Sequence, residues 1–216
     1  MRVVIAGGHG QIALHLEKLL AQRRDEPVGL VRNPAHEPDL TAVGAETVVL
    51  DLEKSDVDAV ARVLRGADAA VFSAGAGPGS GEARKDSVDR GAAVLFAEAA
   101  GRAGVRRFVQ VGSMGADNPD APGLDPVFAL YLRAKRAAEE DLKTRDLDWT
   151  ILRPGALTND SGTGRVKIAE QTGRASVPRE DVAAVLLALL DAPATAGRTL
   201  ELISGEDSIE DAVSAL

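Results

Sequence analysis

The sequence opens with a short apolar stretch, a glycine turn and an amphipathic segment, and this order constrains the fold more than any other feature. Residues 3–6, Val-Val-Ile-Ala, are typical of a buried strand. Gly7 and Gly10 follow at once, and apolar residues then recur at helical spacing from Ile12 to Leu20. A strand, a tight glycine turn and a helix are the context that a dinucleotide-binding fingerprint requires. A turn that serves only the fold is the alternative.

The spacing of the turn is G-x-x-G-x-x-A, and each small residue has a distinct expected task. Gly7 allows the chain to turn off the strand, Gly10 lets a diphosphate approach the main chain, and Ala13 lets the helix lie close on the strand. The free N–H groups at the helix start would face the phosphates. The predicted nucleotide contacts of this turn are Gly7, Gly8, Gly10, Gln11 and Ile12.

Apolar runs alternate with helical patterns along most of the remaining chain. Strands are predicted at residues 28–31, 46–50, 68–72, 107–111, 148–152 and 199–203, and helices at 57–64, 85–103, 127–145, 179–190 and from 208 onward. Glycine-rich residues 73–79 and residues 116–126 are predicted to be loops. This alternation predicts an α/β fold, a Rossmann-type doubly wound parallel sheet with helices on both faces.

The pattern becomes less regular beyond Pro154-Gly155, which we expect to break the sixth strand. Residues 165–169 and 174–177 are predicted to pair as a hairpin across the short segment between them. We expect residues 156–216 to form a small substrate-side lobe within one domain that spans residues 1–216. Because this lobe is short, it offers little room for a substrate pocket.

Composition excludes several functional classes. The formal net charge of −8 and the lack of a basic stripe argue against a nucleic-acid partner. Cysteine is absent, which removes disulfides and thiolate metal sites and fits a cytoplasmic protein. The longest apolar run, 182–190, is too short to span a membrane, and the three histidines have no metal-ligand spacing. We therefore expect a small-molecule substrate, no metal, and a monomer or homodimer.

The residue after the second predicted strand indicates which nucleotide binds. An acidic residue at this position would bind the ribose 2′-hydroxyl of NAD(H), whereas this chain has Arg32 followed by Asn33. A guanidinium can hold a 2′-phosphate through two hydrogen bonds. The sequence therefore predicts NADP(H) in preference to NAD(H), and an ordinary exposed arginine is the alternative.

Other candidate cofactor contacts follow the ends of further strands, because ligands of open parallel sheets bind at that edge. Asp51, next to Leu52, could accept a hydrogen bond from an adenine amino group, or it could cap the following turn. Small residues after the fourth strand would permit close approach of a cofactor. The remaining predicted contacts are Ser73, Ala74, Gly75, Pro154 and Gly155.

Tyr131 and Lys135 are the residues most suggestive of catalysis. They are four residues apart in a predicted helix and so share a face, and Tyr131 is the only tyrosine in the chain. A lysine ammonium beside a phenol stabilises the phenolate, so Tyr131 could act as a proton donor. Ser113, just after the fifth strand, could hold a substrate carbonyl oxygen, and Lys135 could also contact the nicotinamide ribose. A tyrosine that anchors its helix and a solvated lysine are the alternative.

With these residues assembled, the chain resembles the short-chain dehydrogenase/reductase superfamily, in particular its atypical NmrA-like, NAD(P)H-binding branch. The matching pieces are Gly7-x-x-Gly10-x-x-Ala13, Val31-Arg32-Asn33-Pro34, Asp51-Leu52, Ala103 to Ser113, Tyr131-x-x-x-Lys135, Leu152-Arg153-Pro154-Gly155 and Val177 to Ala183. Two departures are Ala13 in place of a last glycine and Gly112 where this branch often has a second serine.

The resemblance implies a Rossmann fold that binds NAD(P)(H), with Ser113, Tyr131 and Lys135 as catalytic residues. The first hypothesis is an NADP(H)-dependent oxidoreductase that transfers hydride to a small carbonyl or similar acceptor. A non-catalytic NADP(H)-binding redox sensor is the second hypothesis, because this branch also contains such sensors. A sugar-nucleotide epimerase is a third, which the short segment after Gly155 disfavours.

Overall fold

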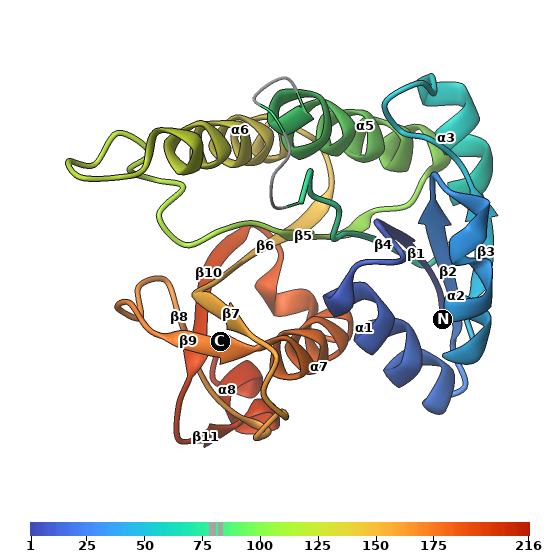
Figure 1. The fold of residues 1–216 in the computed structure, drawn as a ribbon. Coiled ribbons are helices and arrows are strands. Elements are labelled where there is room, and N and C mark those ends of the chain that lie inside the picture. Colours follow the sequence, from blue (N-terminus) through green and yellow to red (C-terminus); the bar gives the residue numbers. More distant parts are fainter. Residues whose placement is uncertain (78–80, 82–83) are drawn as a thin grey trace.

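The computed structural model describes residues 1–77, 81 and 84–216, and these residues are arranged around a nine-stranded sheet (Figure 1). Seven strands are parallel, in the order β3-β2-β1-β4-β5-β6-β10, and β8 and β11 extend the β10 edge in antiparallel pairings. The strands are β1 (Arg2–Ala6), β2 (Glu26–Val31), β3 (Glu46–Val49), β4 (Ala69–Phe72), β5 (Arg107–Val111), β6 (Asp148–Pro154), β8 (Arg165–Ala169), β10 (Arg198–Ser204) and β11 (Asp207–Ser208). The predicted Rossmann-type parallel sheet is confirmed.

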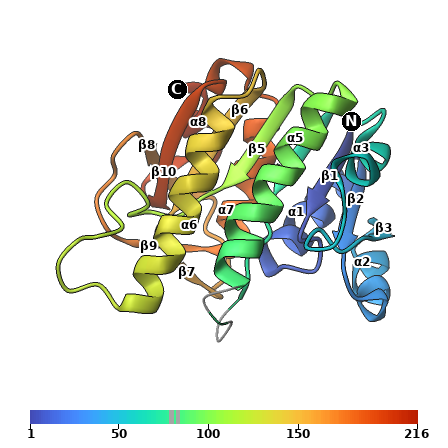
Figure 2. The same ribbon diagram turned by 90° about the horizontal axis from the view of Figure 1, so that it is seen from above.

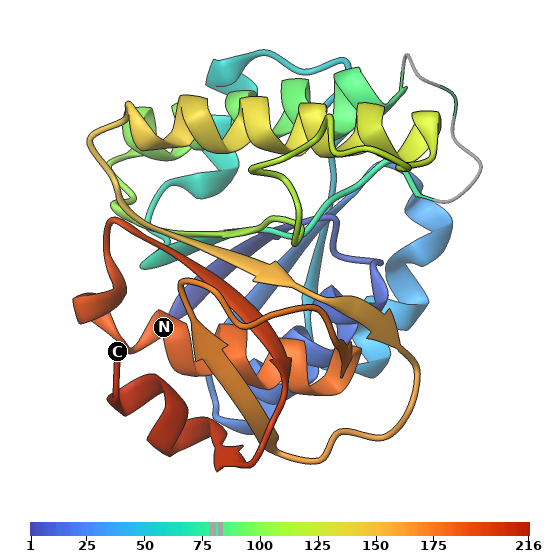
Figure 3. The same ribbon diagram turned by 90° about the vertical axis from the view of Figure 1, so that its left-hand side faces the viewer.

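Helices cover both faces of the sheet (Figures 2 and 3). One face carries α1 (Gln11–Gln22), α7 (Arg179–Leu190) and α8 (Ile209–Ser214), and the other carries α3 (Val57–Leu64), α5 (Ala93–Ala103) and α6 (Pro126–Lys143). The π-helical segment Lys85–Ala92 leads directly into α5. A short helix, α2 (Glu37–Ala42), lies beside β3, after the 3-10 turn Pro34–His36. The predicted helices are therefore present, and α2 is a further helix that was not predicted.

Two cores lie on opposite sides of the sheet because strand side chains alternate between its faces. In β1, Val3 and Ile5 pack toward α1 and α7, whereas Val4 and Ala6 pack toward α3 and α5. Phe72, Phe96 and Phe108 form the centre of the second core, with ring centroids 6.1 and 5.8 Å apart in successive pairs. No helix among the described residues is both long and apolar enough to cross a membrane.

The predicted hairpin of residues 165–169 and 174–177 is wrong. β8 instead pairs antiparallel with β10 and β11, and β9 (Ser176–Pro178) pairs in parallel with β7 (Ala156–Thr158). Each strand buries one apolar residue in the first core, Val166 in β8 and Val177 in β9, so each is held by its own distant partner. Residues 156–216 thereby share the main sheet and its core.

Two other predictions need comment. β6 continues through Pro154, beyond the predicted break, because the proline carbonyl accepts a hydrogen bond from the Met114 N–H (3.2 Å) and the residue pairs with Leu202. The loop predicted for residues 73–79 is described only as far as Gly77, and residues 78 and 79 lie outside the described residues.

An acidic side chain, Glu17, is fully buried between α1 and β2. Its Oε1 atom would lie only 2.6 Å from a Cβ on Gly29 and 3.0 Å from one on Gly8, so it fills the gap that these two glycines leave. Neither carboxyl oxygen has a hydrogen-bond partner among the described residues. Burial away from water raises the pKa of Glu17 to about 8, so the side chain is mostly protonated at neutral pH.

The buried acid makes stability depend on pH. Because its pKa is higher in the folded chain than in the unfolded chain, the folded protein retains a proton that the unfolded one loses as the pH rises from about 4.5 to about 8. We expect the free energy of unfolding to fall by up to about 3 kcal/mol between pH 5 and 8. In Glu17→Gln this fall should disappear, whereas Glu206→Gln, which changes an exposed acid, should retain it. Urea unfolding at several pH values measures the slope, and equal slopes in Glu17→Gln and wild type would contradict the burial argument.

Candidate functional site

Adjoining hollows lie at the carboxyl ends of the parallel strands. The first, of about 210 Å³, lies beyond β1 to β4, and the second, of about 560 Å³, lies beyond β4 to β6 beside α6. Ser73 to Ala76 line both, so the two hollows lie on either side of this loop. The predicted site residues that line one or the other are Gly7, Gly10, Ile12, Arg32, Asp51, Leu52, Ser73, Ala74, Gly75, Ser113, Tyr131, Lys135, Pro154 and Gly155.

The glycine turn lies at the first hollow and leaves it open. Gly7 has a φ of +82°, and a Cβ there would come within 2.7 Å of the Ala74 Cα, so the turn requires glycine on both counts. Gly10 precedes α1, and no side chain caps the N–H groups at that helix start. A Cβ on Gly10 would come close only to the Gly7 carbonyl oxygen, at 3.1 Å, and would otherwise project into the open space. The turn therefore fits a diphosphate held by backbone N–H groups.

Three predicted contacts lie elsewhere. A Cβ on Gly8 would come within 2.7 Å of the Gly29 Cα, so Gly8 serves the close packing of the turn on β2. Gln11 is exposed at the first position of α1. The Asn33 side chain accepts a hydrogen bond from the Ala35 N–H (3.1 Å) and caps the 3-10 turn. None of the three lines the first or second hollow.

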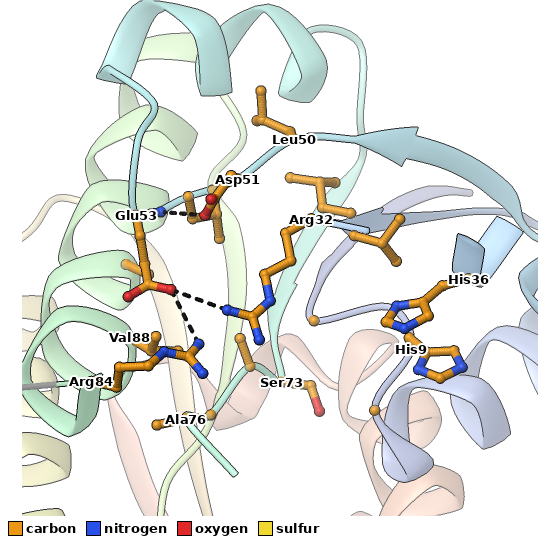
Figure 4. A pocket seen from close by; sticks show the side chains of 18 residues that line it. His9, Arg32, His36, Leu50, Asp51, Glu53, Ser73, Ala76, Arg84 and Val88 are labelled. Atoms are coloured by element: carbon orange, nitrogen blue, oxygen red, sulfur yellow. Dashed lines mark hydrogen bonds and ion pairs between the residues drawn. The ribbon is translucent and has the colours of Figure 1, made fainter. Parts of the chain in front are cut away.

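Two arginines meet one carboxylate at the rim of the first hollow (Figure 4). The Arg32 Nη1 atom lies 3.4 Å from Glu53 Oε2, and Arg84 Nη2 lies 3.1 Å from the same oxygen. Ser87 donates to the other oxygen at 2.6 Å, and this bond, together with Arg84, lowers the pKa of Glu53. Arg84 and Glu53 were not predicted as site residues. They show that Arg32 belongs to a pair of guanidinium groups arranged around an anion.

The aspartate at the end of β3 fits the capping alternative. Asp51 Oδ1 accepts the Glu53 N–H at 3.1 Å, and Oδ2 lies 3.4 Å from Lys54 Nζ. Its side chain thus stabilises the following turn while it lines the hollow. A contact to an adenine amino group stays a prediction.

His9 and His36 face each other at the same hollow (Figure 4). Their rings are stacked with centroids 3.7 Å apart, and His9 Nε2 lies 2.7 Å from Asp39 Oδ2. The sequence showed only that the histidines lack metal-ligand spacing, and it did not predict this stacked pair. No group of three metal-binding side chains occurs within residues 1–77 and 84–216.

The predicted catalytic residues all line the second hollow, but Lys135 is more deeply engaged than expected. Only 4% of Lys135 is exposed. Its Nζ atom donates to the carbonyl oxygens of Val111 (3.2 Å) and Ala74 (3.5 Å) and lies 3.4 Å from Asp89 Oδ1. The ammonium thus bridges the ends of β4 and β5.

Tyr131 is half-buried in the wall of the second hollow. Its ring centroid lies 5.7 Å from Lys135 Nζ and 5.6 Å from Lys85 Nζ, and its ring stacks on that of Phe128 with centroids 5.7 Å apart. The Ser113 hydroxyl donates to the Met114 carbonyl at 3.4 Å. The three predicted residues therefore line the same hollow, and two ammonium groups rather than one lie near the tyrosine ring.

Asp89 is a site residue that the sequence analysis missed. It is 1% exposed on the π-helical segment, and its Oδ2 accepts a long hydrogen bond from the Ala76 N–H (3.3 Å). The sequence could have indicated this role, because Asp89 lies on the apolar stripe of the helix, ahead of the buried Ala93 and Phe96. A charged residue on such a stripe is unusual and calls for a buried partner, here Lys135.

A second buried ion pair supports the loop that carries Ser113. Arg153 donates to Glu139 from Nη2 (2.6 Å) and Nε (3.1 Å), and both side chains are buried. A Cβ on Gly112 would come within 2.4 Å of Glu139 Oε1. The glycine next to Ser113 is therefore explained by the carboxylate beneath it.

The fold and the open glycine turn define a Rossmann-type nucleotide-binding protein. The family model described as NAD(P)H-binding matches residues 7–193, and the chain belongs to this family.

Similar proteins agree with that membership. The "Uncharacterized sugar epimerase YhfK" of Bacillus subtilis is 35% identical over 100% of both chains. A solved structure described as a putative NAD-dependent epimerase/dehydratase from Bacillus halodurans is 36% identical, with a TM-score of 0.93 over 100% of both chains. The structure of ChuY, described as an anaerobillin reductase from Escherichia coli O157:H7, is 25% identical, with a TM-score of 0.78, and the match covers 94% of this chain and 97% of that one.

The geometry of the turn predicts different outcomes for its glycines. In Gly10→Val the side chain would occupy the space where the diphosphate is expected, so NADPH binding should fall below detection with little loss of stability. Gly8→Ala should instead lower stability by about 1–3 kcal/mol, because it forces the turn away from β2. Gly101→Ala, at an open position of α5, is the control for both. Calorimetric titration and thermal unfolding measure the two effects, and unchanged NADPH affinity in Gly10→Val would rule out this diphosphate position.

Proposed function

We propose that the protein is an NADP(H)-dependent oxidoreductase of the short-chain dehydrogenase/reductase type that acts on a small carbonyl or similar acceptor. The observation that carries this proposal is that Ser113, Tyr131 and Lys135 line one hollow, which the Ser73–Ala76 loop joins to the glycine turn. Membership of the NAD(P)H-binding family supports the nucleotide, and the similarity to a structure described as an anaerobillin reductase supports the reaction class. The absence of cysteine supports our expectation of a cytoplasmic enzyme.

The preference for NADP(H) is supported by the arginine pair at the first hollow. Arg32 and Arg84 approach the same Glu53 oxygen, so two cations are already held around one anionic position. A 2′-phosphate beside Arg32 would find charge-assisted donors there, whereas a 2′-hydroxyl would not need them. We place the glycine turn at the diphosphate and the second hollow at the nicotinamide.

In the proposed reaction, NADPH held at the glycine turn and Arg32 would supply the hydride that reduces the carbonyl carbon of the acceptor. Ser113 orients the carbonyl oxygen through its hydroxyl, and Tyr131 donates a proton to that oxygen. The acceptor is reduced to an alcohol and the nucleotide is oxidised to NADP⁺. Lys135 and Lys85, each less than 6 Å from the Tyr131 ring centroid, stabilise the phenolate that remains.

Lys135 has one N–H donor that makes no hydrogen bond. Its ammonium has three N–H groups and donates to the carbonyl oxygens of Val111 and Ala74, while Asp89 Oδ1 lies 3.4 Å away as an ion-pair partner. The predicted contact of Lys135 to the nicotinamide ribose would therefore compete with the attraction of Asp89 for this donor. We keep Lys135 as a group that tunes Tyr131 and treat the ribose contact as secondary.

The redox-sensor hypothesis is supported by one specific observation. Asp89 neutralises the ammonium of Lys135, and Lys135 holds the ends of β4 and β5 together. A protein that binds the nucleotide without catalysis would also need this structural support. The epimerase hypothesis has in its favour the similarity to the Bacillus subtilis protein named as an uncharacterized sugar epimerase. Net oxidation of NADPH, followed at 340 nm with an acceptor present, distinguishes the oxidoreductase from the other two, because neither a sensor nor an epimerase consumes the nucleotide.

The cofactor preference depends on Arg32. Wild type should bind NADPH more tightly than NADH, and Arg32→Ala should lose about ten- to a hundred-fold in NADPH affinity while its NADH affinity changes little. Arg62→Ala, on the exposed face of α3, is the charge-matched control. Fluorescence titration with both nucleotides gives the dissociation constants. Equal wild-type affinities for NADPH and NADH would refute the assignment of Arg32.

The catalytic role of Tyr131 makes a separate prediction. Tyr131→Phe should bind NADPH almost normally, because the ring still stacks on Phe128, but its turnover should fall by about 10²- to 10⁴-fold. Lys135→Met should also lose activity, and the double variant should be little worse than either single one. Steady-state kinetics on an accepted carbonyl and NADPH titration provide the two readouts. Turnover of Tyr131→Phe at the wild-type rate would exclude this acid.

A further inference from the structure

A third and larger hollow opens beside the proposed reaction site. It measures about 920 Å³ and includes Ser113 and Tyr131 in its wall, together with residues of the loop between β8 and β9. The short segment after Gly155 predicts little room for a substrate, and that prediction is wrong. Other parts of residues 156–216 also line the hollow, namely β7, the start of α7 and one residue of β10. Its volume suits an acceptor of more than one ring.

Apolar side chains gather at the mouth of this hollow. Among the described residues, Val127, Phe128 and Leu157 are three of only five large apolar residues with a substantial exposed fraction, at 48%, 43% and 39%. Phe128 and Leu157 line the third hollow, and all three line the second. They come from the start of α6 and from β7, which lie far apart in the sequence. Such a concentration of exposed apolar surface is typical of a ligand site.

Two guanidinium groups in the wall have unused donors. Arg174 has no hydrogen bond or ion pair with any described residue, and Arg179 donates once, from Nη1 to Asn159 Oδ1 (2.6 Å).

The carboxylates in the same wall already have partners. Glu201 Oε2 accepts both the N–H and the hydroxyl of Thr172, at 2.7 and 3.2 Å, and Asp117 lies 3.7 Å from Arg153 Nη1. Apart from the hydroxyls of the proposed reaction site, the side-chain donors left for a ligand in this hollow are the arginines and the amides of Asn118 and Gln171. Of these only the arginines are charged, and their guanidinium groups suit a planar oxyanion.

We propose that the acceptor of this enzyme is an aromatic or otherwise apolar carbonyl compound that carries an oxyanion such as a carboxylate. Its apolar body would lie on Phe128 and Leu157, its oxyanion would face Arg174 and Arg179, and its carbonyl would reach Ser113 and Tyr131. This inference rests on the proposed function for the reaction, but the ligand class follows from the lining of the hollow alone.

The test compares each acceptor acid with its uncharged methyl ester. The probes are 4-formylbenzoate and 4′-formylbiphenyl-4-carboxylate, each beside its methyl ester, and the two lengths sample the reach from Tyr131 to the arginines. We expect kcat/KM with NADPH to be at least about tenfold higher for one acid than for its ester. This ratio should approach one in the Arg174→Gln/Arg179→Gln double variant and stay at its wild-type value in Arg62→Gln. Thermal unfolding confirms that each variant is folded.

A binding measurement separates this inference from the proposed reaction. Biphenyl-4-carboxylate and biphenyl-4-carboxamide are titrated into wild type and the double variant in saturating NADP⁺. If no aldehyde is reduced but the carboxylate binds at least about tenfold more tightly than the amide, and only with both arginines present, the reaction is wrong and the ligand class stands. If acids and their esters are turned over at equal rates, the proposed ligand class is wrong and the proposed reaction stands. Absence of both turnover and carboxylate preference overturns both.

Discussion

The structure depends on close contact between main chains at the end of β1. The Gly7 turn lies against Ala74 after β4, and Gly8 lies against Gly29 in β2, with no room for a Cβ at either glycine. Because Gly7 and Gly8 have no side chains, the ends of β1, β2 and β4 lie close together, and α1 starts directly over them. The first hollow, its loop to the second and the uncapped start of α1 all follow from this packing. Buried Glu17 fills the space behind it, at a cost in stability that grows with pH.

Local patterns were sufficient for much of this fold. The strand–turn–helix from residue 3 to residue 20 was predictable because its periodicity and its glycines are consecutive in the sequence. The partners of β8 and β9 were not, since Val166 and Val177 show only that each strand has a buried side, and nothing local selects β10 or β7 as its neighbour. Strand pairing over such separations is decided by the assembled sheet.

The residues of the candidate site also differ in whether local patterns in the sequence could predict them. Arg32, Ser113 and Tyr131 could be found because each follows a strand or lies at a fixed spacing on a helix. Glu53 and Asp89 could not be found by those rules, because their importance comes from cations that are distant in the sequence. Acids are common on helices and turns, so only the assembled structure distinguishes these two from solvated ones. Gly8 is a different case, because this motif position packs closely on Gly29, and its predicted contact to the nucleotide stays a prediction.

Two buried ion pairs lie behind the proposed reaction site. Both hold loops in place, and neither leaves an unpaired charge for a ligand. Arg153 and Glu139 lie behind Ser113, and Lys135 and Asp89 lie behind the loop after β4. Desolvation makes such pairs poor sources of net stability, so their value here is in fixing geometry.

This geometry has a consequence for the proposed chemistry. Asp89 offsets much of the field that Lys135 would exert on Tyr131, and the ammonium lies 5.7 Å from the ring rather than in a hydrogen bond with the hydroxyl. Lys85, at 5.6 Å on the ring, then becomes a comparable source of positive charge, although it lies on a different helix. The phenolate would be stabilised jointly by a fixed, neutralised cation and by a second cation nearer the opening of the hollow. In the proposed mechanism, the activity of Tyr131 therefore depends on how the π-helical segment packs against α6 as much as on the Tyr–Lys spacing within α6.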